Sequence, residues 1–196
     1  MTEKADRRIQ RTKKALREAV LELVIEIGFE NLTIEKITEH ANLGRTTFYL
    51  HYRDKHELLL DSLQTQIDSL FNEIYSPENI EKWVNQGDDP RKLVFIHASE
   101  NPELYKMLFT NQVSGTVFNQ FRNHISSILE TITQAIQERD NLTPKLPNAV
   151  VTNYVSGALV GLISWWLEND MPYSPEEIYQ MYHMLLVEGA VKSIGI

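Results

Sequence analysis

The sequence predicts an all-α protein with a small helix-turn-helix head and a larger helical body. Apolar residues recur every three or four positions along most of the 196 residues, which is the spacing of amphipathic helices. No segment alternates between apolar and polar residues for long enough to indicate a strand. Proline, glycine and capping residues interrupt the pattern at intervals that suit short connections between helices. A chain of this length can bury a substantial core.

The first predicted helix begins with positive charge and follows a polar stretch, Met1 to Arg8, that we expect to be mobile. Cations at a helix start oppose the helix dipole, and a phosphate backbone would offset that cost. A charged end that is simply solvated is the alternative. Gly28 is expected to end this helix as its C-cap. The cations are Arg7, Arg8, Arg11, Lys13, Lys14 and Arg17, and the apolar face is Leu16, Val20, Leu23, Val24 and Ile27.

The stretch from Thr33 to Leu59 predicts two short helices, a tight turn between them and the start of a third helix. Thr33 is a candidate N-cap, and Asn42-Leu43-Gly44 interrupts the helical pattern as a turn. The second helix, about Arg45 to His51, is too short and too polar to be stable alone, so Phe48 is expected to anchor it in the core. This arrangement has the shape of a helix-turn-helix whose second helix enters the major groove of DNA. An ordinary surface hairpin of helices is the alternative.

The segment ANLGRTTFYLHYRDKHELLLDSL resembles the signature of the tetracycline-repressor (TetR) family of transcription regulators. The resemblance covers about the first quarter of the chain and extends upstream through IGFENLTIEKI. Gly44 stands where a Ser or Thr cap is usual, and Thr46 stands where Gly is frequent, which leaves the operator sequence open. The matching positions are Ala41, Gly44, Arg45, Thr46, Thr47, Phe48, Tyr49, Leu50, His51, Tyr52 and Lys55.

The resemblance implies two kinds of DNA contact. Phosphate contacts fix the register of the protein on the duplex without reading sequence. Base contacts are expected from Arg45 and Thr46 at the front of the second helix, where an Arg can bond guanine O6 and N7. Leu50 is placed to touch a thymine methyl group, and a core aromatic is the alternative for Tyr49. The residues that match phosphate-binding positions of the family are Thr47, Tyr49, His51 and Lys55.

The net charge of −8 does not exclude DNA binding, because the charge is unevenly distributed. Before Leu58 the cations roughly match the acids, whereas from Leu58 onward the acids outnumber the cations by more than two to one. A local basic surface, rather than the net charge, binds phosphate. The absence of cysteine excludes disulfides and thiolate metal sites and fits a reducing cytosol. The N-terminus is charged from Glu3 onward, a pattern that does not predict a signal peptide, so we expect a cytoplasmic protein.

The pattern divides the chain into a DNA-binding domain, residues 1–54, and a ligand-binding and dimerisation domain, residues 55–196. The joining helix is predicted from Lys55 to about Tyr75, with Asp54 as its cap and with first-turn amides that, together with Lys55, can hold a phosphate. Asn79 to Asp89 is predicted as a loop or a short helix. Further helices are predicted over Arg91 to Ser99, Glu103 to about Gln112, and Thr116 to Arg139.

The last two predicted helices are the most apolar. Asn148 to Leu167 carries no charge, and Ser174 with Glu177 forms a capping box for a final amphipathic helix that reaches Val191. A membrane span is an alternative by length, and Gly157 and Gly161 suit it. Its four polar residues (Thr152, Asn153, Ser156 and Ser164) favour a buried helix and no membrane contact. In TetR relatives this helix pair forms a homodimer interface, and the two glycines would permit close helix approach within the subunit or across that interface.

No catalytic constellation is present in the sequence, and the six histidines form no close ligand pair, so no cofactor or metal is expected. The family resemblance implies a pocket for a small-molecule effector between Leu93 and Trp166. Apolar residues at helical spacing are equally what a core requires. The candidate pocket residues are Phe95, Tyr105, Met107, Phe121, Tyr154 and Trp165.

The sequence therefore predicts a ligand-responsive DNA-binding transcription regulator, with repression as the expected action, that binds an inverted-repeat operator as a homodimer. The segment YVSGALVGLISWWLENDMPYSPEEI resembles a TetR subgroup that includes regulators of dihydroxyacetone utilisation. Some of those act as activators through a partner protein, so the sign of regulation stays open. A helical adaptor that binds only proteins and a small helical enzyme are the competing hypotheses.

Overall fold

The computed structural model describes residues 3–109 and 115–189. Within these ranges every regular element is a helix, so the all-α prediction is confirmed. The elements are α1 (Glu3–Ile27), α2 (Ile34–His40), α3 (Arg45–Tyr49), α4 (Lys55–Ile74), α5 (Pro77–Gln86), the 3-10 helix η1 (Pro90–Lys92), α6 (Leu93–Glu100), α7 (Pro102–Phe109), α8 (Gly115–Asp140), α9 (Asn148–Glu168) and α10 (Pro175–Val187).

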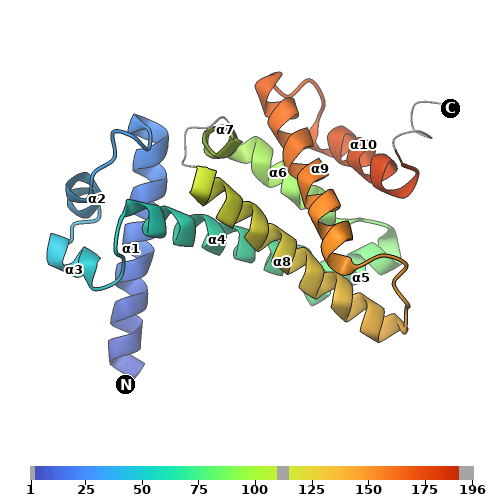
Figure 1. Ribbon diagram of the computed structural model, residues 1–196, viewed down its shortest axis with the longest axis horizontal. Coiled ribbons are helices and arrows are strands. Elements are labelled where there is room, and N and C mark those ends of the chain that lie inside the picture. Colours follow the sequence, from blue (N-terminus) through green and yellow to red (C-terminus); the bar gives the residue numbers. More distant parts are fainter. Residues whose placement is uncertain (1–2, 110–114, 190–196) are drawn as a thin grey trace.

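The first three helices form a separate head at one end of the molecule (Figure 1). Helix α1 begins at Glu3, so the mobile polar stretch that the sequence predicted up to Arg8 is wrong over its helical part. The polar residues continue the helix because they present no breaker to it. The helix ends at Gly28, whose φ of +76° is the left-handed value expected of a glycine C-cap. Its apolar face, with Leu16 and Val20 fully buried, forms the centre of the head.

Helix α4 runs from the head into the body (Figure 1). Leu58 and Leu59 in its first turns are fully buried in one cluster with the apolar face of α1. Phe71 and Ile74 at its far end belong to the same cluster, which continues into the body. The N-terminal turns of α4 therefore complete the core of the head, while its C-terminal turns belong to the body.

The middle of the chain contains more helix than the sequence indicated. The segment predicted as a loop or a short helix forms α5, which Ser76 caps through the amide of Asn79. This helix buries none of its residues fully, so it lies on the surface. The helix predicted to start at Arg91 is divided into η1 and α6. The helix predicted to reach Gln112 corresponds to α7, and its last residues lie outside the described ranges.

Helix α9 spans Asn148–Glu168, close to the predicted Asn148 to Leu167, whereas α10 ends at Val187, four residues before the predicted Val191. The capping box of Ser174 and Glu177 is present at the start of α10, whereas Val191 lies outside the described residues. One side of α9 packs along α8, where the hydroxyls of Ser126 and Ser156 lie 2.8 Å apart and both side chains are buried.

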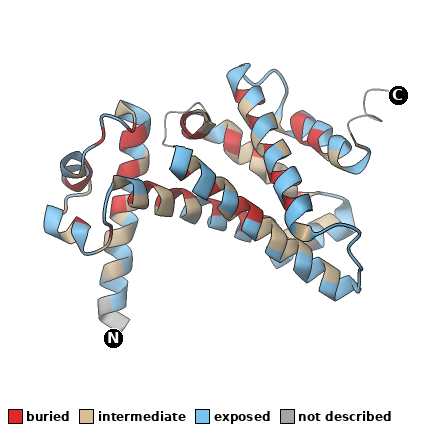
Figure 2. Cartoon of the chain, in the orientation of Figure 1, coloured by how far each residue is buried: buried red, intermediate tan, exposed pale blue. Residues whose placement is uncertain are grey.

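Helix α9 is long and apolar enough to cross a membrane by length and composition, and a third of its apolar window (33%) is buried inside the chain. Its polar residues Thr152 and Ser156 face the interior of the subunit, as a helix of a packed bundle requires. The other side is exposed in the single chain, as the pale blue surface of this helix in Figure 2 makes visible.

Candidate nucleic-acid interface

The turn between α2 and α3 is set by local backbone chemistry. Thr33 caps α2 by accepting a hydrogen bond from the amide of Lys36 at 3.2 Å, as predicted. After α2 ends, Asn42 takes a left-handed φ of +53°, which asparagine tolerates better than most residues. The amide of Leu43 then bonds the carbonyl of Thr38 at 2.8 Å and closes the turn. Gly44 starts α3 without a side-chain cap.

Helix α3 is too short to hold itself, and buried aromatic residues fix it. Phe48 is fully buried, and Tyr52 just beyond the helix is buried beside it, with ring centroids 5.9 Å apart. The hydroxyl of Tyr52 donates to Asp61 of α4 at 2.6 Å. Burial and the hydrogen bond to Asp61 both raise the pKa of Tyr52, so the phenol stays protonated. The recognition helix is therefore held from behind by contacts to α4.

The outward side of α3 carries the residues that the sequence assigned to DNA. Tyr49 is 54% exposed, with its edge toward the ring of Phe48, so the interpretation of Tyr49 as a core aromatic is wrong. Leu50 is 75% exposed. Arg45 and Thr46 are exposed, and Thr47 and His51 are partly exposed. These six residues lie on or directly after the helix, and all are at least partly exposed.

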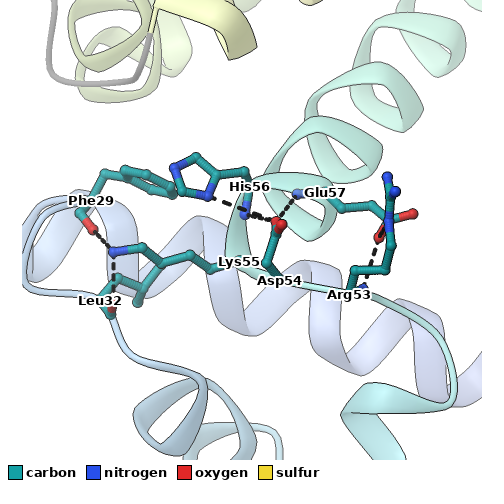
Figure 3. A network of polar contacts seen from close by, with 7 residues as sticks. All are labelled: Phe29, Leu32, Arg53, Asp54, Lys55, His56 and Glu57. Carbon is teal, nitrogen blue, oxygen red and sulfur yellow. Dashed lines mark hydrogen bonds and ion pairs between the residues drawn. The ribbon is translucent and has the colours of Figure 1, made fainter.

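Lys55 has a different position from the other six residues. Its Nζ donates to the carbonyl of Phe29 at 2.8 Å and to the carbonyl of Leu32 at 2.9 Å, and it lies 4.5 Å from the centre of the Phe29 ring (Figure 3). These bonds direct the ammonium into the connection between α1 and α2. Lys55 therefore ties the head to the first turn of α4, which is a structural role that sequence spacing did not indicate.

The expectation that the first turn of α4 holds a phosphate stays a prediction, and the amides that would bind the phosphate already have a partner. Asp54 caps the helix as predicted, but its carboxylate accepts the amides of both His56 and Glu57 at 2.9 Å (Figure 3). Glu57 in turn accepts the amide of Arg53 at 2.8 Å, and hydrogen bonds from Arg53 lower the pKa of this carboxyl. Two carboxylates therefore occupy the place where an anion would have to bind.

The cations of α1 divide into two groups. Arg17 donates to Asp61 at 3.3 Å and to Thr65 at 3.2 Å, so it joins α1 to α4. Lys13 lies over the ring of Tyr52, 5.3 Å from its centre. Nearer the N-terminus, Arg8 and Arg11 are exposed on the part of α1 that extends past the rest of the head (Figure 1). Arg8 and Arg11 are therefore available for long-range attraction of phosphate.

The body contains a hollow of about 250 Å³. Of the six pocket residues that the sequence predicted, Phe95 alone lines this hollow. Tyr105 and Phe121 lie at much smaller gaps of about 10 and 20 Å³, and Met107 is buried in the core. Tyr154 and Trp165 are exposed on α9, 63% and 44% respectively. The hollow is lined by Phe71, Ile74, Tyr75, Arg91, Val94, Phe95, Leu129, Ile132, Thr133, Ile136, Val155, Leu159, Tyr179, Tyr182, His183 and Leu186.

Sequence reasoning missed Arg91, the charged residue of this lining. Its Nε donates to the two carboxylate oxygens of Asp89 at 2.9 and 3.0 Å, and Nη2 bonds the same carboxylate. Burial alone would raise the pKa of Asp89, but the hydrogen bonds from Arg91 and Tyr179 outweigh it, so the pKa lies below its ordinary value. The pair is therefore ionised at neutral pH. An arginine two residues after a capping aspartate was the available signal.

Comparison with known families matches both parts of the chain. The family model for bacterial regulatory proteins of the tetR family matches residues 16–61, and a model for a transcriptional regulator C-terminal region matches residues 92–188. The HTH-type regulator YxbF of Bacillus subtilis is 24% identical over 183 residues, which are 92% of this chain and 46% of that protein. The HTH-type regulator YdeS of the same organism is 37% identical over 60 residues, 30% of each chain. The chain thus spans half or less of the length of these relatives.

Solved structures share the fold over nearly the whole chain. A TetR-family regulator from Syntrophomonas wolfei superposes with a TM-score of 0.68 at 16% identity, covering 95% of this chain and 97% of that one. FadR from Bacillus subtilis, solved with stearoyl-CoA, gives 0.64 at 17% identity, covering 90% and 98%. The dihydroxyacetone kinase operon activator DhaS gives 0.61 at 17% identity, covering 90% and 94%. With both of its parts matched by regulator models and with this shared fold, the chain belongs to the tetR family of DNA-binding transcription regulators.

Proposed function

We propose that this protein is a homodimeric transcription regulator that reads an inverted-repeat operator through α3. When a small molecule binds in the body, the dimer dissociates from the operator or changes its position on it. The observation that carries the proposal is the outward surface of α3. Arg45, Thr46, Tyr49 and Leu50 are exposed there, while Phe48 is fully buried beneath them. A short helix that is fixed by buried contacts, and that exposes hydrogen-bond donors and one apolar side chain, can recognise bases in the major groove of DNA.

The individual roles follow from position on α3. Arg45 and Thr46 at its start reach base edges, and Leu50 contacts a thymine methyl group. Thr47, Tyr49 and His51 donate to phosphates and fix the register. Lys55 acts behind the interface by holding the connection of α1 and α2 against α4. Arg8 and Arg11 on the extended part of α1 add to the attraction of the duplex.

A homodimer through the last two helices is supported by an exposed stripe on α9. Val150, Tyr154 and Trp165 lie along it at helical spacing with Gly157 and Gly161 between them, and all are exposed. A Cβ built on either glycine meets nothing within 4 Å in the subunit, so close approach inside the subunit does not explain them. Met181, Met184 and Leu185 are exposed on α10. A second copy would cover these apolar residues and present two heads to two half-sites.

The effector site is the hollow at the far end of α4. Phe71, Ile74 and Tyr75 line it from the last turns of this helix, and Lys55 ties the first turn to the head. A helix of 20 residues transmits a displacement over about 30 Å. FadR proteins solved with stearoyl-CoA or lauroyl-CoA share this fold, which makes an apolar effector a reasonable class. Repression with release by the effector is the proposed action.

Selection of bound sequences from random duplex DNA by the full chain tests this function. An inverted repeat should emerge, because two α3 helices related by a two-fold axis read the same bases on opposite strands. Binding should weaken steeply with salt, as phosphate contacts require. No enrichment, or binding that salt leaves unchanged, would reject the proposal and favour an adaptor that binds only proteins.

A further inference from the structure

The hollow in the body has an uneven lining. Within the part of the chain that the structure describes, its walls are mostly aliphatic and aromatic side chains from α4, α6, α8, α9 and α10. One charged side chain, Arg91 of η1, reaches the lining, and the polar residues Tyr75, Thr133, Tyr179, Tyr182 and His183 accompany it. The hollow is therefore apolar with one cationic position, which is how specific sites for amphipathic molecules are built.

Arg91 is held in a fixed orientation. Asp89 does not line the hollow. Its carboxylate accepts hydrogen bonds from Nε and Nη2 of Arg91 on the side away from the hollow. The ring of Trp83 lies on the guanidinium, 5.0 Å from Cζ to the ring centre. Tyr179 hydrogen-bonds the carboxylate of Asp89 and lines the hollow beside the arginine. The cation is thus positioned in advance, so a ligand that uses it loses little freedom of this side chain on binding.

The charge of this position selects among ligands. The bonds to Asp89 use Nε and Nη2, so Nη1 is not engaged by that carboxylate. An arginine offers five N–H donors in a planar fork that fits carboxylates. An ammonium ligand would be repelled by the guanidinium and would find no carboxylate among the lining residues. A ligand with several negative charges would meet the field of Asp89 directly behind the arginine.

The size of the hollow limits the ligand further. A dry cavity of roughly 150 Å³ accommodates benzene, and drug-sized ligands occupy pockets of about 300–1,000 Å³. At about 250 Å³ the hollow lies between these values. It suits a ligand with a compact apolar part and a single polar group.

We propose that the hollow binds a small amphipathic monocarboxylate, with its carboxylate on Arg91 and its aliphatic part against Phe71, Phe95 and Leu159. This inference rests on the proposed function only for the statement that the bound molecule is the effector. Binding itself is measured without DNA. A failure of the ligand assignment and a failure of the DNA-binding assignment are therefore distinguishable.

The test is calorimetric titration of the full chain with three probes of equal length, namely octanoate, octan-1-ol and octylamine. Octanoate should bind about tenfold or more tightly than octan-1-ol, because a hydrogen bond to a charged group contributes more than one to a neutral group. Octylamine should bind more weakly than the alcohol. Equal affinity for octanoate and octan-1-ol, preference for octylamine, or no binding of any probe would overturn the inference.

Two substitutions in the pair give opposite expected results. Arg91→Gln should remove the preference for octanoate over octan-1-ol. Asp89→Asn keeps an oxygen for the guanidinium and for the amide of Arg91, but removes the competing charge, so octanoate should bind several-fold more tightly. A purely structural pair would give weaker binding in both variants. Because Arg91→Gln leaves Asp89 without its cation and can fail to fold, the Asp89→Asn result decides alone in that case.

Arg139→Gln is the matched control. Arg139 is an arginine of α8 that pairs with Asp140 and lines an adjoining open groove between α5 and α8, while Arg139 itself does not line the hollow. Octanoate affinity should be unchanged in this variant, and a loss there would place the carboxylate in the groove and overturn the inference. If octanoate binds as expected and the chain fails to select any duplex sequence, the proposed function is rejected while the ligand assignment stands.

Discussion

Phe48 and Tyr49 are adjacent aromatic residues of α3 with different surroundings. The ring of Phe48 is fully buried, the ring of Tyr49 is 54% exposed, and the two centroids lie 5.5 Å apart. Since α3 has five residues and no side-chain cap, its position depends on Phe48 and on Tyr52 behind it. Stability and recognition are therefore divided between neighbouring residues.

Replacement of these two residues by alanine should separate the two roles. Phe48→Ala removes a fully buried ring and should lower the free energy of unfolding by about 3–5 kcal/mol. Tyr49→Ala should leave stability nearly unchanged and weaken binding to operator and random duplexes alike, as the loss of a phosphate contact does. Urea unfolding and fluorescence anisotropy with both duplexes measure the effects. A large loss of stability in Tyr49→Ala would contradict its assignment.

Arg45 should instead affect specificity. Its exposed position at the start of α3 suits a bidentate bond to guanine, so Arg45→Ala should relax discrimination at one base position of each half-site by about 1–3 kcal/mol. Competition binding against operators with single base changes measures this loss. Equal losses of affinity on operator and random DNA would refute base reading by Arg45.

Lys55 and Arg11 should differ in their salt response. Arg11→Ala should reduce the slope of log K against log salt by about 1, because it removes a cation that acts on phosphate. Lys55→Ala should leave that slope nearly unchanged and lower stability, because its ammonium bonds the carbonyls of Phe29 and Leu32. Binding titrations at several salt concentrations, with unfolding curves, test both. A slope reduced as much by Lys55→Ala as by Arg11→Ala would restore Lys55 to the interface.

At the scale of elements, local chemistry was predictable from the sequence and tertiary pairing was not. The caps of Thr33, Asp54 and Ser174 depend on residues within three positions, and all three are present. The pairs of Lys55 with Leu32 and of Arg17 with Asp61 join residues 23 and 44 positions apart. Spacing along the chain carries no information about such contacts, so the bonds of Lys55 to the carbonyls of Phe29 and Leu32 could not be predicted.

Periodicity has a similar limit in the body. It identifies which residues face inward, but it does not say which inward residues border a gap. Phe95 and Phe121 are both buried on regular helices, yet of these two only Phe95 lines the 250 Å³ hollow. Arg91 was not predicted, because a charged residue close to a capping aspartate is normally interpreted as part of the start of a helix. The hollow is defined by where five helices fail to fill space, which is a property of the assembly.

The packing of α6 on α7 should make stability depend on pH through His97. Its Nδ1 lies 2.9 Å from the hydroxyl of Tyr105, and burial lowers the pKa of His97 against the opposing influence of Glu100 and Glu73. The unfolded chain therefore gains this proton first as pH falls below about 6.5. The stability that depends on neutral His97 is full above that pH and is lost as the pH falls toward the folded-state pKa.

Replacement of His97 by glutamine should reduce this loss. The free energy of unfolding of the unmodified chain should decline between pH 7 and 5 with a contribution of at most about 1.4 kcal/mol per pH unit from this one group. The His97→Gln variant should show a shallower decline. Urea unfolding at several pH values gives the comparison, and parallel curves for the two proteins would assign the dependence to other groups.

The head and the exposed apolar stripe of α9 lie on different elements of the molecule. Helix α4 contacts α1 of the head and α8, and α8 contacts α9 (Figure 1). The single chain leaves Tyr154 and Trp165 of α9 and Met184 of α10 exposed. A soluble chain with such a stripe gains by covering it, since apolar burial contributes about 25 cal/mol per Å². In the proposed homodimer, a two-fold partner would cover the stripe and supply the second head that an inverted repeat requires.

Gly161→Glu should therefore convert the dimer to a monomer with a folded head. The carboxylate would be placed in the centre of the apolar stripe, while within the subunit a Cβ at this position meets no atom within 4 Å. Sedimentation velocity should give one subunit instead of two, with unchanged helix content by circular dichroism. Affinity for a full inverted repeat should fall to that for a half-site, because the second head no longer binds as part of the same assembly. A monomeric unmodified chain, or a dimer that survives Gly161→Glu, would exclude this interface and leave the pairing of heads without its basis.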